Sequence, residues 1–252
     1  MAATEPVTIR AHAKLTRSLR ITGLRADGYH LIDAEMVSLD LHDTLTIEPG
    51  GSGLAATGPF RDGVPLDDSN LVAKALHVAG RAALITIDKR IPHGGGLGGG
   101  SADAAAVLRW AGHGTSARAL DTASRLGADI PFCLVGGRAR VRGIGEIVEP
   151  LDFVESIVTL VIPPLAVSTP AAYRAWDDLG GPTADGPNDL EPAAIVVEPR
   201  LARWRDLIGE RTGRSPTLAG SGATWFTEGE HGNALADLVD EGATVVVART
   251  GP

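Results

Sequence analysis

Hydrophobic and polar residues alternate along the first part of the chain, and this alternation predicts a β-strand. In residues 7–21 the odd positions are mostly apolar and the even positions mostly polar, which is typical of a strand with one buried face. Lys14 falls on the polar face, where solvent or a ligand would lie. Arg17 interrupts the apolar register, and we interpret it as the site of a bulge or bend.

The same alternation returns after the turn residues Asp27-Gly28 and predicts two further strands, with His42-Asp43 as the interruption between them. Residues 50–68 are rich in Gly, Pro and Asp and predict a loop or a weak hairpin. Ser69 can then cap a helix that carries apolar residues between positions 71 and 76.

Elements with clear periodicity follow in the rest of the chain. A short strand at residues 84–87 leads into a glycine-rich segment, and the alanine-rich segment after it predicts a helix capped by Ser101 or Asp103. The remaining predictions are a helix at 116–126, strands at 138–142 and 157–162, helical spacing at 201–208 and 234–239, and a buried strand at 244–248.

Two loop segments suggest where the chain divides. Paired prolines stand at 163–164, and residues 180–187 are rich in Gly and Pro. We place a domain boundary near residue 150, which predicts one domain of residues 1–150 and a second of residues 151–252.

The segment 91–103 contains six glycines and opens onto the predicted helix, and this junction favours phosphate binding. A helix N-terminus presents unpaired N–H groups and the positive end of its dipole, while glycines let the main chain approach an anion closely. A Walker loop is excluded because no lysine precedes Ser101. A dinucleotide fingerprint through Gly94, Gly96 and Gly99 is weak, because so many glycines satisfy it by chance. A flexible linker is the remaining alternative.

Composition narrows the class of protein. The chain has 252 residues, 44% of them hydrophobic, which is enough for one large domain or two small ones. No apolar stretch reaches the roughly 18 residues of a membrane span, and residues 1–6 lack an export signal, so we expect a cytoplasmic protein without a membrane partner. Cys133 is the only cysteine, which excludes an intramolecular disulfide. The net charge of −8 argues against nucleic acid as a partner, and we expect a monomer or weak homodimer.

A set of short motifs resembles the GHMP kinase superfamily, named for galactokinase, homoserine, mevalonate and phosphomevalonate kinases. Besides the glycine-rich segment, the motifs are Ala13-Lys14-Leu15, Arg25-Ala26-Asp27-Gly28-Tyr29-His30, Gly127-Ala128-Asp129-Ile130-Pro131-Phe132, Gly143-Ile144-Gly145-Glu146, Asn188-Asp189-Leu190-Glu191 and Gly220-Ser221-Gly222-Ala223-Thr224. Within the superfamily this ordered set is similar to the 4-diphosphocytidyl-2-C-methyl-D-erythritol kinase family and spans most of the chain.

The resemblance implies an α+β (two-layer α/β) GHMP kinase fold. Its N-terminal ATP-binding domain would contain a portion like ribosomal protein S5, and its C-terminal domain would be a ferredoxin-like α/β domain. The implied reaction is ATP-dependent phosphorylation of the 2-hydroxyl of a cytidine diphosphate sugar alcohol, in the non-mevalonate route to isoprenoid precursors. The implied cofactors are ATP and Mg²⁺.

The resemblance also implies roles for two charged residues. Asp129 would accept the proton of the attacking hydroxyl, and Lys14 would orient that carboxylate and offset charge on the transferred group. The two side chains should therefore lie within hydrogen-bond reach. An aspartate before Pro131 can equally serve an ordinary turn, and Lys14 can be a solvated strand lysine.

Further residues are implied to bind the two substrates. Those matched to ATP are Asn70, Lys89, Pro92, His93, Gly94, Gly95, Gly96, Leu97, Gly98, Gly99, Gly100, Ser101 and Ala102. Among them Asn70 and Lys89 match the adenine end, and Ser101 the terminal phosphates or Mg²⁺. Those matched to the acceptor are Thr16, Asp27, Tyr29, His30, Thr169 and Tyr173. An aromatic ring offers a stacking face, and an imidazole can read a base edge.

Two departures keep alternatives open. Thr16 stands where the family often has Asn, and Ala102 where it often has a second Ser. A GHMP kinase for another small alcohol therefore remains possible. A non-catalytic nucleotide-binding module is disfavoured because Lys14 and Asp129 are both present. A dinucleotide-dependent oxidoreductase would need an acidic residue at the end of a second strand about twenty positions past the glycines, where the pattern predicts a helix instead.

Overall fold

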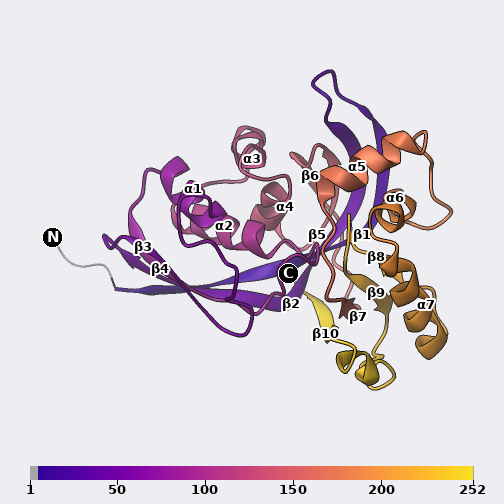
Figure 1. Ribbon diagram of the computed structural model, residues 1–252. Helices are drawn as coiled ribbons and strands as arrows, with labels where there is room; N and C mark the ends of the chain where they lie inside the picture. Colours follow the sequence, from indigo (N-terminus) through magenta and orange to yellow (C-terminus); the bar gives the residue numbers. More distant parts are fainter. Residues whose placement is uncertain (1–4, 252) are drawn as a thin grey trace.

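Two long antiparallel strands, β1 (Val7–Leu24) and β2 (His30–Pro49), form the centre of the fold (Figure 1). The computed structural model describes residues 5–251. The expectation that residues 1–6 lack an export signal therefore concerns residues that lie mostly outside this range. The alternation in residues 7–21 is confirmed as a strand, and the register of β1 against β2 shifts between Thr16 and Ser18. The bulge predicted at Arg17 is thus confirmed, whereas Lys14 is 5% exposed rather than placed toward solvent.

The prediction of two strands between residues 30 and 49 is wrong, because β2 is continuous. His42 and Asp43 do not interrupt it, since they pair with His12 and Ala11 of β1. One edge of β2 pairs with β1, and the other edge stays paired because its neighbour changes along the strand. Its first part pairs with β5 (Arg138–Gly143), and its last part pairs with β4 (Ala83–Asp88).

Residues 50–68 contain β3 (Gly53–Thr57), which pairs in parallel with β4, so the segment is neither a plain loop nor a hairpin. The helix that follows, α1 (Leu71–Val78), is capped by Asn70 rather than by Ser69. The Asn70 side chain accepts a hydrogen bond from the Val72 N–H at 2.8 Å. The Ser69 hydroxyl instead donates to Asp67.

Helix α2 (Gly99–Trp110) packs against β1 and β2, and its residues from Ala102 to Leu108 are all buried. It begins at Gly99, within the glycines, so neither Ser101 nor Asp103 caps it. Beside it lie α3 (Ala117–Ser124), which Ser116 caps within the predicted range, and α4 (Ile130–Val135), which the hydrophobic pattern did not predict. Figure 1 shows α1 to α4 gathered over one face of the sheet.

The second half of the chain adds its own strands and helices to the same sheet. The elements are β6 (Ile147–Pro150), β7 (Ile157–Ile162), α5 (Thr169–Asp178), α6 (Glu191–Val197), α7 (Arg200–Thr212), β8 (Thr217–Leu218), β9 (Trp225–Glu228), the 3₁₀ helix η1 (Ala236–Val239) and β10 (Thr244–Gly251). Within the described residues the order across the sheet is β3-β4-β2-β10-β7-β9-β8, with β1, β5 and β6 off this path. Strand β10 joins the halves because Thr250 and Gly251 pair with β2.

Most predictions for this half are confirmed, and two are wrong in detail. Strands β5 and β7 and helix α7 lie where the pattern placed them. The segment at 234–239 forms only the short 3₁₀ helix. Strand β10 runs beyond residue 248, and only Ala248 in the predicted range is fully buried. The strand pairs with β7 along residues 244–249 and with β2 at its end.

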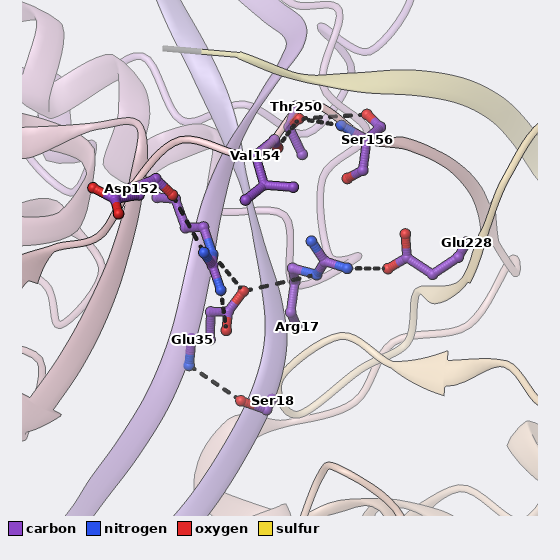
Figure 2. A network of polar contacts seen from close by, with 9 residues as sticks. Arg17, Ser18, Glu35, Asp152, Val154, Ser156, Glu228 and Thr250 are labelled. Carbon is purple, nitrogen blue, oxygen red and sulfur yellow. Dashed lines mark hydrogen bonds and ion pairs between the residues drawn. The ribbon is translucent and has the colours of Figure 1, made fainter.

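Arg17 joins the two halves where β1 bulges, as Figure 2 shows. Its guanidinium contacts Glu228 of β9 and lies 4.0 Å from Glu35 of β2, which also accepts a hydrogen bond from Arg138 at 2.9 Å. Nearby, the Thr250 hydroxyl donates to the Val154 carbonyl at 3.0 Å. These contacts lie close to the boundary predicted near residue 150, and that division stays a prediction. No helix within residues 5–251 is both long and apolar enough to cross a lipid bilayer.

Candidate active site

A cavity of about 630 Å³ lies where the glycine-rich segment, the β1–β2 turn and helix α5 meet. We call it the central cavity. The residues that line it are Lys14, Thr16, Leu19, Gly28, Tyr29, His30, Ile32, Met36, Gly96, Ser101, Ala128, Asp129, Ile144, Thr169, Pro170, Tyr173, Arg174, Asp177, Leu190, Gly220 and Ser221. Both halves of the chain contribute, so the cavity exists only in the folded protein.

Lys14 and Asp129 meet in this cavity. The Lys14 Nζ lies 3.4 Å from Asp129 Oδ2, and it donates a hydrogen bond to the Thr16 hydroxyl at 3.1 Å. The Lys14 side chain is 6% exposed and that of Asp129 is 31% exposed, so the ammonium is buried and the carboxylate is reachable. An ion pair with one accessible carboxylate oxygen can accept a proton from a bound hydroxyl.

The turn that holds Asp129 depends on Gly145, which lies in the turn after β5. A Cβ atom at Gly145 would stand 2.2 Å from the Ala128 carbonyl oxygen, and its φ of +120° also favours glycine. Asp129 occupies the N-cap position of α4 but makes no capping hydrogen bond. The Asp129 carboxylate is therefore not used as a helix cap and lies 3.4 Å from the Lys14 Nζ.

The glycine-rich segment lies directly against Lys14. The Lys14 N–H donates to the Leu97 carbonyl at 3.0 Å, and a Cβ atom at Gly98 would stand 2.7 Å from Lys14 Cγ. Gly98 is the N-cap residue of α2 and provides no side-chain cap. The first N–H groups of this twelve-residue helix are consequently without a side-chain partner, as an anion site requires.

A second glycine turn supports the first from the other half of the chain. A Cβ atom at Gly96 would stand 2.8 Å from the Gly222 carbonyl oxygen. The Thr224 N–H donates to the Gly95 carbonyl at 3.3 Å. Asn188 fixes this second turn, because its Nδ2 donates to the Gly220 carbonyl at 2.7 Å. The close approaches explain why both segments are glycine-rich.

Not every residue matched to ATP reaches the central cavity. Of the thirteen matched residues only Gly96 and Ser101 line it, and Asn70, Lys89 and the rest of the segment lie outside its lining. Others in the segment differ in exposure: His93, Gly94 and Gly100 are exposed, Gly98 and Gly99 half-buried, and Pro92, Gly95, Leu97 and Ala102 buried. Asn70 is engaged by its capping bond and by donation to the Pro65 carbonyl at 2.6 Å.

Lys89 lies in a buried ion cluster beneath the first turn of α2. Its Nζ contacts Asp43 and lies 2.7 Å from Asp103 Oδ2. Burial raises the pKa of Asp103 to about 7, and its Oδ1 is buried without a partner among the described residues. Burial alone would lower the pKa of Lys89, but the charges of Asp103 and Asp43 outweigh it and raise that pKa. Asp103 and Asp43 were not expected to act together, because sixty residues separate them in the chain.

The opposite end of the central cavity is aromatic. The His30 ring stacks on Tyr173 with ring centroids 4.7 Å apart, and it meets the Trp176 ring edge-on at 5.6 Å. The His30 Nε2 lies 2.8 Å from Asp177 Oδ1. Burial, followed by the charge of Asp129, raises the pKa of Tyr173 to about 12, so this phenol stays neutral. Tyr29 is 60% exposed at the rim and can cover a flat ligand.

Of the remaining residues matched to the acceptor, two line the cavity and one does not. Thr16 and Thr169 line the cavity, and the Thr169 hydroxyl lies 2.8 Å from that of Ser221. Asp27 does not line it, because its carboxylate accepts two hydrogen bonds from Arg25, whose guanidinium lies 5.4 Å from the Tyr29 ring centroid. That hydrogen bonding lowers the pKa of Asp27. Asp27 thus shapes the β1–β2 turn rather than facing the cavity.

Four polar residues of the site were not predicted individually. Asn188 and Ser221 lie within motifs that carry the resemblance, so those motifs could have indicated them. No motif indicated Arg174 or Asp177, because the hydrophobic pattern did not predict α5. Once this helix forms, residues 173, 174 and 177 fall on one side of it and face the cavity.

The arrangement suits phosphoryl transfer between two substrates that enter from opposite ends. An uncapped helix N-terminus offers N–H donors for phosphate at one end, and stacked aromatic rings offer a binding surface for a base at the other. The Lys14–Asp129 pair lies between them. No group of three His, Cys, Asp or Glu side chains within residues 5–251 is arranged to hold a metal ion. A Mg²⁺ ion carried by nucleotide phosphates needs only one or two protein oxygens, and the Ser101 hydroxyl lines the cavity.

Comparisons with known proteins agree with this geometry. Residues 70–137 match the model of the GHMP kinases N terminal domain. The chain is 41% identical over 239 residues to 4-diphosphocytidyl-2-C-methyl-D-erythritol kinase of Paracoccus denitrificans, covering 86% of this chain and 84% of that one. It is 39% identical to the enzyme of the same name from Cereibacter sphaeroides, covering 86% and 87%.

Solved structures give the same picture. The crystal structure of a 4-(cytidine 5'-diphospho)-2C-methyl-D-erythritol kinase superposes with a TM-score of 0.78 at 31% identity, covering 98% of this chain and all of that one. A homoserine kinase from Cytophaga hutchinsonii superposes with a TM-score of 0.67 at 17% identity, covering 100% and 96%. The second likeness shows the shared fold, and the expected GHMP kinase fold is confirmed.

Proposed function

Because the chain belongs to the 4-diphosphocytidyl-2-C-methyl-D-erythritol kinase family, we propose that it transfers the γ-phosphoryl group of ATP to the 2-hydroxyl of 4-diphosphocytidyl-2-C-methyl-D-erythritol. The relatives that bear this name are 35–41% identical to the chain, and the matched regions cover most of their length. The observation that supports the assignment best is the 3.4 Å Lys14–Asp129 pair, which lies in one cavity with the glycine-rich segment and the aromatic end.

In the proposed reaction the acceptor hydroxyl lies beside Asp129. Its proton passes to the Asp129 carboxylate as its oxygen bonds to the γ-phosphorus, and the bond from that phosphorus to the bridging oxygen of ADP breaks. The Lys14 ammonium keeps the carboxylate oriented and offsets negative charge on the transferred group. Thr16 fixes the ammonium through its hydrogen bond, a role that a hydroxyl can fill.

ATP would lie along the glycine-rich segment, with its phosphates at the N-terminus of α2. Residues 92–102 approach it mainly through their backbone, and the Ser101 hydroxyl reaches the terminal phosphates. Asn70 and Lys89 act from beside the segment, since the first starts α1 and the second anchors the turn before α2. A bound Mg²⁺ ion would neutralise phosphate charge there, with Ser101 as a protein ligand.

The acceptor would occupy the aromatic end. Tyr29 and Tyr173 offer the stacking faces for cytosine, and His30 a nitrogen for its edge. Arg174 lines the cavity on the way to Asp129, where its guanidinium can meet the diphosphate. Thr169 and Ser221 close that side, and Asp27 keeps Tyr29 in place through Arg25.

Several broader properties belong to the same proposal. We expect the enzyme to work in the cytoplasm as a monomer or weak homodimer, without nucleic acid as a partner. Its two domains would be residues 1–150 and 151–252, with the substrates held between them.

The test is a screen of phosphoryl acceptors. The protein is incubated with ATP and Mg²⁺ and, separately, with 4-diphosphocytidyl-2-C-methyl-D-erythritol, homoserine and mevalonate. We expect ADP release and a new phosphomonoester signal in ³¹P NMR only with the cytidine compound. If another alcohol is phosphorylated and the cytidine compound is not, the substrate assignment is wrong, although the protein is still a kinase.

A further inference from the structure

His30 is held in the acceptor end of the cavity from three sides, and each contact restricts it differently. Tyr173 stacks on one face of the ring, and Trp176 meets it edge-on. Trp176 is itself fixed, because its Nε1 donates to the Pro182 carbonyl at 2.9 Å. These aromatic contacts set the plane of the imidazole, but they do not determine which ring nitrogen carries the proton.

Only Asp177 distinguishes the two ring nitrogens of His30. Its Oδ1 lies 2.8 Å from Nε2, and an ionised carboxylate can only accept a hydrogen bond. Nε2 therefore carries the proton. Within residues 5–251 no other group hydrogen-bonds to this ring, so Nδ1 is left as an acceptor.

An acceptor nitrogen in this position favours cytosine over uracil. Cytosine carries an exocyclic amino group, which donates, where uracil carries a carbonyl oxygen, which accepts. A neutral imidazole with a bare Nδ1 can receive the amino group and repels the carbonyl oxygen. With the proton on Nδ1, the preference at that position would reverse.

We infer that Asp177 sets the base selectivity of the acceptor site by holding His30 in the tautomer with a free Nδ1. The inference rests on the proposed function, since it assumes that the acceptor's base lies against His30. Asp177 is a positioning residue here, because it acts on the ligand only through the imidazole. Its side chain is 50% exposed, so we expect the fold to tolerate a change there.

The decisive variant is Asp177→Lys. An ammonium can only donate, so a lysine that reaches Nε2 forces the proton onto Nδ1. The matched control is Asp178→Lys, which makes the same change of charge at the next, exposed residue of α5. Both variants and the wild type are assayed at the same pH.

The first readout is the ratio of kcat/KM for the cytidine diphosphate alcohol to that for its uridine counterpart. We expect Asp177→Lys to lower this ratio by about tenfold or more, as the loss of one well-placed hydrogen bond and a reversed dipole would do. The change should appear in the acceptor KM, with kcat and the ATP KM close to wild type. The control should keep the wild-type ratio. Equal ratios in the two variants would overturn the inference.

The second readout needs no turnover. In ¹⁵N-histidine-labelled protein, the His30 signals are identified by their loss in His30→Gln. We expect Nε2–H in the wild type and Nδ1–H in Asp177→Lys, and a preference for CDP over UDP in calorimetry that weakens in the same variant. Absence of turnover with both alcohols would reject the proposed function alone. A wild-type His30 with its proton on Nδ1 would reject the inference alone.

Discussion

The two ends of the central cavity are built in different ways. The nucleotide end consists of one continuous segment, residues 94–101, whose backbone lies against Lys14 and the Gly222 turn. The acceptor end is made of side chains from three distant places: His30 at the start of β2, Tyr173 and Asp177 on α5, and Ser221 in the late turn. In the proposed function, one end would recognise phosphate through backbone N–H groups, and the other would recognise a base through particular side chains.

The difference predicts how each end responds to substitution. At the nucleotide end, added atoms matter more than removed ones, because a Cβ atom would meet Lys14 or a carbonyl oxygen. At the acceptor end, removed rings and carboxylates matter, and added bulk at the rim is tolerated. The Asp129 carboxylate belongs to neither end, so its loss should affect turnover with little effect on the binding of ATP.

The largest expected effect is at this junction. Asp129→Asn removes the proton acceptor while keeping size and shape, and we expect kcat to fall by roughly 10²- to 10⁴-fold. The affinity for ATP, measured by calorimetry, should change little. Asp121→Asn, at an exposed carboxylate of α3, serves as the control and should leave kcat unchanged. Retained turnover in Asp129→Asn would remove this residue from the chemical step.

At the nucleotide end, Gly98→Ala places a methyl group 2.7 Å from Lys14 Cγ at a residue with a φ of +69°. Because the ammonium must shift, we expect kcat to fall by about a hundredfold. Gly100→Ala is the matched control, since a Cβ atom there lies 3.8 Å from Leu71 and its φ is not positive. Steady-state kinetics on both variants would show whether steric contact explains the glycines; equal activities would contradict it.

At the acceptor end, Tyr29→Ala removes the exposed stacking face. We expect the acceptor KM to rise about tenfold, as loss of one base–aromatic contact does, with an unchanged ATP KM. Tyr29→Phe keeps the ring and should restore the wild-type acceptor KM. A rise in the ATP KM in Tyr29→Ala would mean that the two ends are not independent.

The smallest effect on activity is expected from the ion cluster under α2. The folded-state pKa of Asp103, about 7, lies above the ordinary aspartate value of 3.8. Between these values the folded protein holds a proton that the unfolded chain has released, so the free energy of unfolding falls as the pH rises from about 4 to 7.

Asp103→Asn cannot ionise and should remove this slope. We expect the difference in unfolding free energy between wild type and variant to change by ~2 kcal/mol between pH 5 and 7, measured by urea melts. Carboxylates with lowered pKa, such as Asp33 and Glu35, act below this window, and Lys89 with its raised pKa acts above it. Parallel curves for the two proteins would contradict a protonated Asp103.

Much of the fold followed from local pattern. The alternation in β1, the interruption at Arg17 and the helix after Ser116 depend on neighbouring residues, so periodicity located them. The single strand β2 was missed because its continuity depends on β4 and β5, which pair with its two parts. Helix α5 (Thr169–Asp178) was missed because only Ala172 in it is fully buried, so few apolar positions mark it as a helix.

The sequence by itself located the glycine-rich segment before a helix, and the resemblance carried by short motifs singled out Lys14 and Asp129, since short continuous motifs can be found without the tertiary structure. Only the tertiary structure decided that these two charges meet at 3.4 Å, that Lys89 is enclosed by Asp43 and Asp103, and that Asp177 reaches His30. The physical reason is distance along the chain. Contacts between residues separated by 14 to 147 positions arise from strand pairing and helix packing, which no local pattern specifies.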